Sequence, residues 1–181
     1  FISIGLAFLF IELAFIEKFT LILSQPLYAV AVTLCAFLIF SGLGSLYAQW
    51  RMTRATLAVM PSLLARSVSL IGGITLVYII AFPYMTDYLM SMSEPVRIAA
   101  AIVLAAPLAF AMGMPFPLGL AGTRHNDPQL MPWAWGINGC ASVLSAILAI
   151  LLSIEIGFSG VMLSAILFYA LAWMSQPVIR T

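Results

Sequence analysis

Long apolar runs follow one another along this 181-residue chain, and they restrict what it can fold into. Hydrophobic residues make up 64% of the sequence and charged residues only 7%, whereas a soluble domain carries about 25% charged residues. A run of about 20 apolar residues crosses the hydrocarbon core of a bilayer. The sequence therefore predicts an all-α, polytopic membrane protein, built as a single helical bundle in contact with the lipid bilayer.

Prolines mark where the predicted helices begin. Pro26, Pro61, Pro95 and Pro132 each stand before an apolar run, at the position where a missing backbone N–H costs least. With these starts we predict six spans, at about residues 1–23, 26–48, 61–83, 95–122, 132–157 and 159–174. Residues 49–60 are expected to form either an amphipathic segment on the membrane surface or an ordinary polar loop.

The charges predict how the bundle is oriented. Cytoplasmic loops carry an excess of Lys and Arg, and one set of predicted loops and ends holds Arg51, Arg54, Arg66, Arg124, His125 and Arg180. The opposite side holds Asp87 and Glu94, with Arg97 and Lys18 as its cations. We therefore expect a bacterial inner (cytoplasmic) membrane protein with both ends in the cytoplasm. Phe1 has no basic segment before it, so we do not interpret the start as a signal peptide and expect a segment upstream.

Several function classes have no support in the sequence. A net charge of +1 does not suggest nucleic acid. Cys35 and Cys140 lie in apolar runs without metal-ligand spacing, so buried free thiols are expected, and His125 has no second histidine to share a metal. No glycine-rich nucleotide loop, Walker sequence or catalytic triad is recognisable. We expect no cofactor, no metal and no catalytic residues within this chain.

Ionisable residues inside the first and fifth spans are candidates for a polar site. Glu12 lies near mid-span, where an acidic residue costs about 2.5–3.5 kcal/mol, so it must face the interior of the bundle or water. It is either a protonated or hydrogen-bonded group that locks helix packing, or a transport site. Glu17, Lys18 and Glu155 lie nearer the outer end, where a Lys18–Glu155 or a Glu17–Arg97 pair is one arrangement that depth alone allows.

Small residues predict close helix contacts. "SGLGS" (41–45) places Gly42 and Gly44 among serines, and "WGINGCA" (135–141) contains Gly136 and Gly139. Spacing of this kind lets helices approach closely in lipid. We therefore expect packing rather than phosphate binding at these positions, since a phosphate loop needs a preceding strand.

The stretch "AMGMPFPLG" (111–119) predicts a broken helix. Pro115 and Pro117 each remove a backbone donor, freeing the carbonyls of Ala111 and Gly113. Asn138, at the same depth in the fifth span, and nearby main-chain groups are expected to satisfy them. We favour a structural elbow here, although broken helices also mark substrate sites in transporters. Trp133 and Trp135 suit the aromatic belt at the headgroup level.

Several segments together resemble the membrane region of bacterial spermidine synthase-like proteins, in which helices are fused to a Rossmann-type aminopropyltransferase- or methyltransferase-like domain. These are "IGLAFLFIELAFIEKFTLILSQP", "SGLGS", "GMPFPLGL" and "PWAWGINGCASVL", and the likeness covers most of the chain. The matched positions are Glu12, Glu17, Lys18, Pro26, Gly42, Gly44, Pro115, Pro117, Trp133, Trp135, Asn138 and Gly139. Ser24 stands where such proteins often have glycine. The glycine-rich nucleotide pocket of a synthase is missing from this chain, so the resemblance does not imply aminopropyltransferase activity for it.

These observations lead to one expected function and two alternatives. We expect a non-catalytic membrane domain, a fragment or a stand-alone relative of a synthase-like protein. It would serve as an anchor or an accessory subunit, with membrane subunits or further copies of itself as partners. The first alternative is a transporter-like module for a polyamine or another cation, with Glu12 as the binding carboxylate. The second is the membrane half of an enzyme whose cytoplasmic catalytic domain lies upstream or is supplied in trans.

Overall fold

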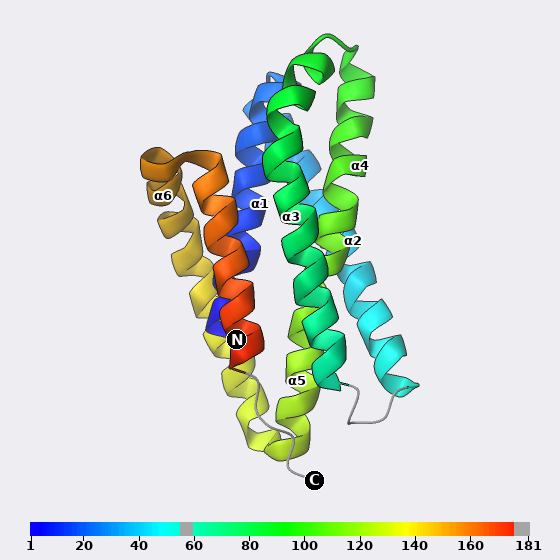
Figure 1. Cartoon of the computed structure of the whole chain (residues 1–181), viewed down its shortest axis with the longest axis vertical. Helices are drawn as coiled ribbons and strands as arrows, with labels where there is room; N and C mark the ends of the chain where they lie inside the picture. The colour runs from blue at the N-terminus through cyan, green and yellow to red at the C-terminus, as the bar shows by residue number, and fades with distance from the viewer. Residues whose placement is uncertain (55–59, 176–181) are drawn as a thin grey trace.

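The computed structural model describes residues 1–54 and 60–175, which form an upright bundle of helices (Figure 1). Over these residues the chain is helical, as the apolar runs predict. The elements are α1 (Ile2–Leu23), α2 (Pro26–Thr53), α3 (Met60–Met90), α4 (Glu94–Met112), α5 (Pro115–Asn126), the short 3₁₀ helix η2 (Pro128–Leu130) and α6 (Met131–Met174). Pro26, Pro61, Pro95 and Pro132 all fall in the first turn of a helix, which confirms their predicted role.

The helices run up and down through the bundle (Figure 1). α1 rises, α2 descends, α3 rises, and α4 with α5 descends to the lower end. α6 rises from there, turns back at the top and descends again, so it has two antiparallel legs. The turn lies at Gly157, whose φ of 66° is left-handed and therefore open to glycine at little cost. This is the predicted boundary between the last two spans.

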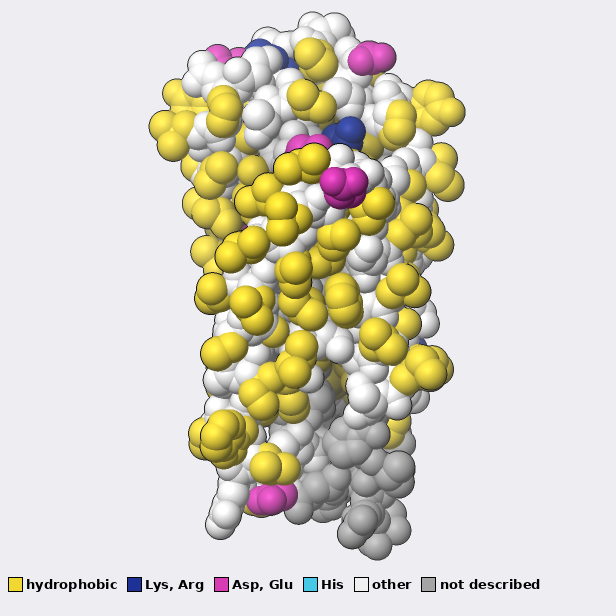
Figure 2. Space-filling view, turned by 90° about the vertical axis from the view of Figure 1, so that its left-hand side faces the viewer, with side chains coloured by type: hydrophobic (Ala, Val, Ile, Leu, Met, Phe, Trp, Pro, Cys, Tyr) yellow, Lys and Arg dark blue, Asp and Glu magenta, His cyan; other side chains and the backbone are white. Residues whose placement is uncertain are grey.

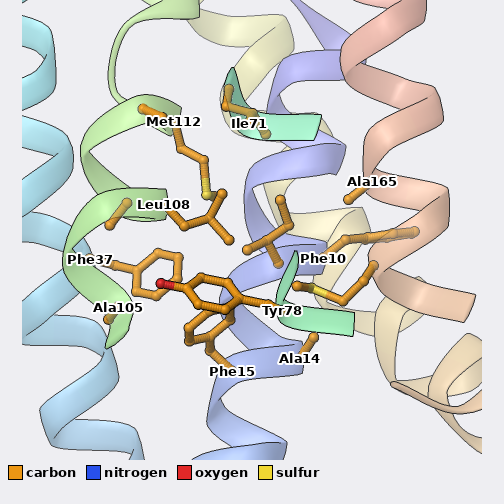
Figure 3. Packing of buried hydrophobic residues seen from close by; sticks show 14 of the residues in the cluster. Phe10, Ala14, Phe15, Phe37, Ile71, Tyr78, Ala105, Leu108, Met112 and Ala165 are labelled. Atoms are coloured by element: carbon orange, nitrogen blue, oxygen red, sulfur yellow. The ribbon is translucent and has the colours of Figure 1, made fainter. Parts of the chain in front are cut away.

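α1 is packed among the other helices, and Phe15 lies at the centre of the core. Its ring meets those of Phe37, Tyr78 and Phe82 edge-on, with centroids 5.4–5.5 Å apart. Such pairs add about 0.5–1.5 kcal/mol each beyond area burial. Figure 3 shows Phe15, Phe37 and Tyr78 converging from α1, α2 and α3, with Leu108 and Met112 of α4 beside them.

Two predicted helix ends are wrong. The third span was expected to stop at Pro83, but α3 continues through that proline to Met90. A proline inside a helix removes one backbone hydrogen bond and crowds the carbonyl four residues earlier, but it does not always end the helix. Phe82 beside it is buried, and its ring centroid lies 5.4 Å from that of Phe158. α2 likewise continues past residue 48 to Thr53. The predicted surface segment at 49–60 is therefore helical at its start, and residues 55–59 lie outside the described part.

The predicted fourth span is broken where the prolines indicate. α4 ends at Met112, and α5 begins at Pro115, whose missing N–H is harmless in a first turn. Pro117 follows inside α5. The break consequently lies at Gly113 and Met114, and it separates a long upper helix from a short lower one.

Among the described residues, four segments are long and apolar enough to cross a membrane. These are Pro26–Thr53, Pro61–Met90, Glu94–Arg124 and Pro128–Met174. The predicted count of six is not confirmed, because α1 carries three ionisable side chains and the two legs of α6 belong to one segment.

Large apolar side chains face outward along the bundle. Leu38, Ile80 and Val143 are each exposed by 68% or more. Figure 2, which faces α6, shows hydrophobic side chains over the middle of the molecule and charged ones toward its ends. A surface of this kind suits a lipid environment.

Candidate functional site

Glu12 is buried near the middle of α1, and only 6% of its surface is exposed. It follows Phe8 by four residues and precedes Phe15 by three, so it shares the helix face that meets the ring of Phe37. No hydrogen bond or ion pair joins its carboxyl to the rest of the described chain. Glu12 is thus a buried acid without a partner among the described residues, so the hydrogen-bonded form of the packing lock is not seen there.

Glu17 and Lys18 do not form the predicted pairs. The Glu17 carboxylate accepts a hydrogen bond from the Ser153 hydroxyl of α6 at 2.6 Å. The Lys18 ammonium lies 4.9 Å above the ring of Phe158, in a cation–π contact. Glu155 is exposed on the first leg of α6. Both the Lys18–Glu155 and the Glu17–Arg97 predictions are therefore wrong, since sequence depth does not say which faces the helices turn toward one another.

Arg97 of α4 instead binds the end of α1. Its Nη1 donates to the carbonyl of Ile22 at 2.9 Å and to the hydroxyl of Ser24 at 3.3 Å, which is a common role for a basic side chain at a helix C-terminus. Ser24 ends α1 with a φ of 59°, a left-handed conformation that glycine adopts most easily.

Asn138 does not cap the helix break. It faces α1, where its backbone oxygen would lie 2.6 Å from a Cβ placed on Gly5, and its Oδ1 is buried without a hydrogen-bond partner. One of the freed carbonyls is satisfied locally, since the amide of Met114 donates to Ala111 at 3.2 Å. The prediction for Asn138 is wrong because the first leg of α6 packs on α1 rather than on the break.

The break is held by a glycine contact between α2 and α4. A Cβ on Gly44 would overlap the carbonyl oxygen of Phe110, and a Cβ on Gly113 would overlap that of Ser41. Each glycine thus lets a carbonyl of the other helix approach its Cα, as in the Cα–H···O contacts found between helices. Close packing at Gly44 is confirmed, and Gly113 is its reciprocal partner.

The other predicted packing glycines are open. A Cβ on Gly42, Gly136 or Gly139 would meet no atom within 4 Å. All three positions are exposed. They are not contacts within this chain, because each lies on a face of its helix that points away from the neighbours.

Other buried polar groups escaped prediction. The Tyr78 hydroxyl donates to the carbonyl of Leu104 at 2.6 Å, within one turn of Pro107 in α4. The hydroxyls of Thr75 and Tyr169 are buried without a hydrogen-bond partner among the described residues. The Ser145 hydroxyl of α6 donates to the carbonyl of Leu6 in α1 at 2.8 Å. Pro107 frees the carbonyl of Val103 rather than that of Leu104, so nothing in the sequence distinguishes these groups.

The described residues contain no group of three or more His, Cys, Asp or Glu side chains that is able to hold a metal ion. Cys35 and Cys140 are free thiols, but both are exposed rather than buried as expected. The side chain of His125 lies outside the described part. Ionisable groups are therefore spread along the bundle instead of converging on one centre.

No protein-family model, no curated protein and no solved structure matches this chain. The likeness to spermidine synthase-like membrane proteins consequently stays a prediction that rests on the sequence motifs.

Proposed function

We propose that this chain is a non-catalytic membrane domain, which anchors a larger protein or assembles with other membrane subunits. The observation that carries the proposal is the apolar, closely packed centre. Rings from α1, α2 and α3 meet around Phe15. Of the two acids in α1, Glu17 accepts a hydrogen bond from Ser153, and Glu12 has no partner in the described chain. Such an interior supports a rigid bundle better than a reaction centre, which needs acid, base and substrate within hydrogen-bond reach.

We also propose that α1 and both legs of α6 cross the bilayer, which makes six crossings. α1 has 22 residues, or about 33 Å at 1.5 Å per residue, against a hydrocarbon core of about 30 Å. Of its ionisable side chains, Glu12 is buried, while Glu17 and Lys18 contact Ser153 and Phe158 of α6.

The proposed orientation places the lower end of Figure 1 in the cytoplasm of a bacterium, with the bundle in the inner membrane. Arg51, Arg54, Arg66 and Arg124 belong to helix ends there, whereas Lys18 and Arg97 lie toward the other end. This distribution follows the positive-inside rule.

Aromatic residues support the same placement. All four tryptophans lie toward the lower helix ends and are 46–67% exposed, while Tyr84 and Tyr88 are exposed at the upper end. From Tyr28 to Trp50, α2 advances 22 residues, or about 33 Å, which matches the span between the two interfaces of a bilayer.

Single cysteines test the orientation. With Cys35 and Cys140 replaced by serine, Thr53→Cys is expected to react with an impermeant maleimide only from the cytoplasmic side, and Ser91→Cys only from outside. Labelling of both from the same side would contradict the proposed path of α3 and α2 through the membrane.

We further propose, from the sequence motifs, that the natural protein belongs with the spermidine synthase-like membrane proteins. A cytoplasmic Rossmann-type domain would then be joined upstream of Phe1 or bound in trans. The proposed cytoplasmic face, formed by the lower ends of α2, α3 and α5, offers such a domain its docking side.

Intact mass and peptide mapping of the protein purified from its native membrane test this proposal. We expect a mass well above 19.6 kDa, with Rossmann-type peptides, or a co-purifying membrane partner at constant stoichiometry. A lone chain of about this mass, monomeric after mild crosslinking in the membrane, would contradict both anchoring and assembly.

Glu12 favours a second candidate, a transporter-like module for a polyamine or another cation. Only 6% of the surface of Glu12 is exposed, and its carboxyl has no partner in the described chain. An acid kept inside a membrane without a structural partner is a functional candidate by default.

Uptake into vesicles reconstituted with the purified protein tests this candidate. Glu12→Gln should abolish uptake of a labelled polyamine without reducing folded yield, while the exposed Glu155→Gln serves as the matched control. Absence of uptake in the wild type, or equal uptake by both variants, would reject it.

A further inference from the structure

We infer that the groove between α1 and the two legs of α6 binds one acyl chain of a phospholipid whose headgroup carries a primary ammonium. Glu17 and Ser153 lie at its polar end, and Ala14 and Ala149 lie on its apolar wall. The inference requires only that the bundle lies in a membrane, so it stands whether the chain is an anchor, an assembly subunit or a transporter.

The groove has three helical walls and a volume of about 310 Å³. Small side chains at Ala14 and Ala149, both 2% exposed, keep α1 and the first leg of α6 from filling it. Ile150 and Ile154 are 57% and 75% exposed, so the groove opens outward. Its size falls at the lower end of the range for small-molecule sites, about 300–1,000 Å³, which suits a narrow chain rather than a bulky ligand.

The polar end of the groove carries an acid without a neutralising cation. Ser153 donates to Oε2 of Glu17 at 2.6 Å, and a carboxylate still has lone pairs on its second oxygen. Lys18, next along the chain, is placed over the ring of Phe158 instead. Glu155 is exposed on the same leg of α6 but does not line the groove. The local charge therefore favours a cationic group.

The headgroup chemistry follows from the geometry of hydrogen bonding. A primary ammonium has three N–H donors, like the lysine side chain, and binds a carboxylate with a charge-assisted hydrogen bond. The quaternary ammonium of a choline headgroup has no N–H to donate. A headgroup of net negative charge is repelled by Glu17. The site thus distinguishes ethanolamine-type lipids from choline and glycerol types.

The depth of the acid suits a headgroup. Ser153 precedes the turn at Gly157 by four residues, which is about 6 Å along a helix. The rest of the groove continues from there toward the middle of the bundle, past Leu13 and Ala149. A lipid with its ammonium at Glu17 consequently lays its chain along the apolar wall.

A second groove supplies an internal comparison. It lies at the other end of the contact between α1 and α6, has a volume of about 440 Å³ and is lined by Ile2, Trp133, Gly136, Ile137, Cys140, Ala141 and Leu144. None of these side chains is charged. It offers apolar contact without the acid, so headgroup preference separates the two sites.

Native mass spectrometry of the purified, delipidated protein tests the inference, with palmitoyl-oleoyl phosphatidylethanolamine, phosphatidylcholine and phosphatidylglycerol as probes. We expect the wild type to retain one ethanolamine lipid about tenfold more tightly than the choline lipid. Glu17→Gln should abolish this preference, because it keeps the shape and removes the charge. Glu155→Gln is the matched control, since this acid does not line the groove, and it should keep the preference.

Location is tested separately with an ethanolamine lipid that carries a diazirine on its acyl chain. Crosslinks are expected at Ile150, Ile154 or Val161, and Ala149→Leu should remove them by filling the groove. If Ala149→Leu does not fold, the crosslinks of the wild type alone decide the location. Equal retention of the three lipids, a Glu155→Gln effect equal to that of Glu17→Gln, or crosslinks confined to the second groove would each overturn the inference.

Discussion

Replacing Gly44 by alanine tests how closely α2 and α4 pack. The added Cβ would overlap the carbonyl oxygen of Phe110 and lie 2.9 Å from its carbonyl carbon. Both obstacles are backbone atoms, so no side-chain rotation removes them. Gly42, two residues earlier on the same helix, has open space at its Cβ position, and Gly42→Ala is therefore the matched control.

The size of the effect follows from the distances. Carbon atoms are in favourable contact at about 3.5–4.0 Å, so the carbonyl carbon alone requires α2 and α4 to separate by about 0.5–1 Å at this crossing, and the overlapping oxygen requires more. A gap of that size forfeits a quarter to a half of the local dispersion energy, and overpacking typically costs about 1–3 kcal/mol. Replacing glycine by alanine also stabilises a helix by at most about 1 kcal/mol through helix propensity, and this gain is common to Gly44→Ala and Gly42→Ala. We expect Gly44→Ala to be about 2 kcal/mol less stable than Gly42→Ala.

Unfolding in mixed micelles, titrated with a denaturing detergent and followed by far-ultraviolet circular dichroism, measures this difference. Gly113→Ala should resemble Gly44→Ala, because its Cβ would overlap the carbonyl of Ser41. The double variant should lose less than the sum of the two, since helices already moved apart leave room for the second methyl group. Equal stability of Gly44→Ala and Gly42→Ala would refute the proposed close approach.

Two further substitutions test the core. Tyr78→Phe removes the hydroxyl that donates to Leu104 and should cost about 1–2 kcal/mol by the same titration, whereas Tyr84→Phe, at a position 80% exposed, should cost close to nothing; similar losses would mean that the Leu104 bond adds no stability. Phe15→Ala should lower the free energy of unfolding by about 3–5 kcal/mol through the cavity it leaves, against a negligible change for Leu38→Ala on the outer face. A small loss for Phe15→Ala would show that the neighbouring rings collapse into the space.

Local properties of the sequence predicted much of the fold. The apolar runs gave the all-helical, lipid-facing class, because transfer of a helix into hydrocarbon depends on its own composition and length. The prolines marked the helix starts and the break before Pro115, since they act on the backbone within one turn. Gly157 marked the turn in α6 for a similar reason. The predicted end of α3 at Pro83 was wrong, because Phe82 is buried in the core and the helix continues to Met90.

Only the tertiary structure decided which faces meet. Lipid and protein interior accept the same apolar side chains, so hydrophobic periodicity gives little sign of the inward face of a membrane helix. Gly44 packs while Gly42 is open, and Asn138 faces α1 instead of the broken helix, because the helix crossings select one side of each helix. The same selection sets Glu17 against Ser153 and Lys18 against Phe158. Ionisable residues were thus found by sequence, but their partners were fixed by packing.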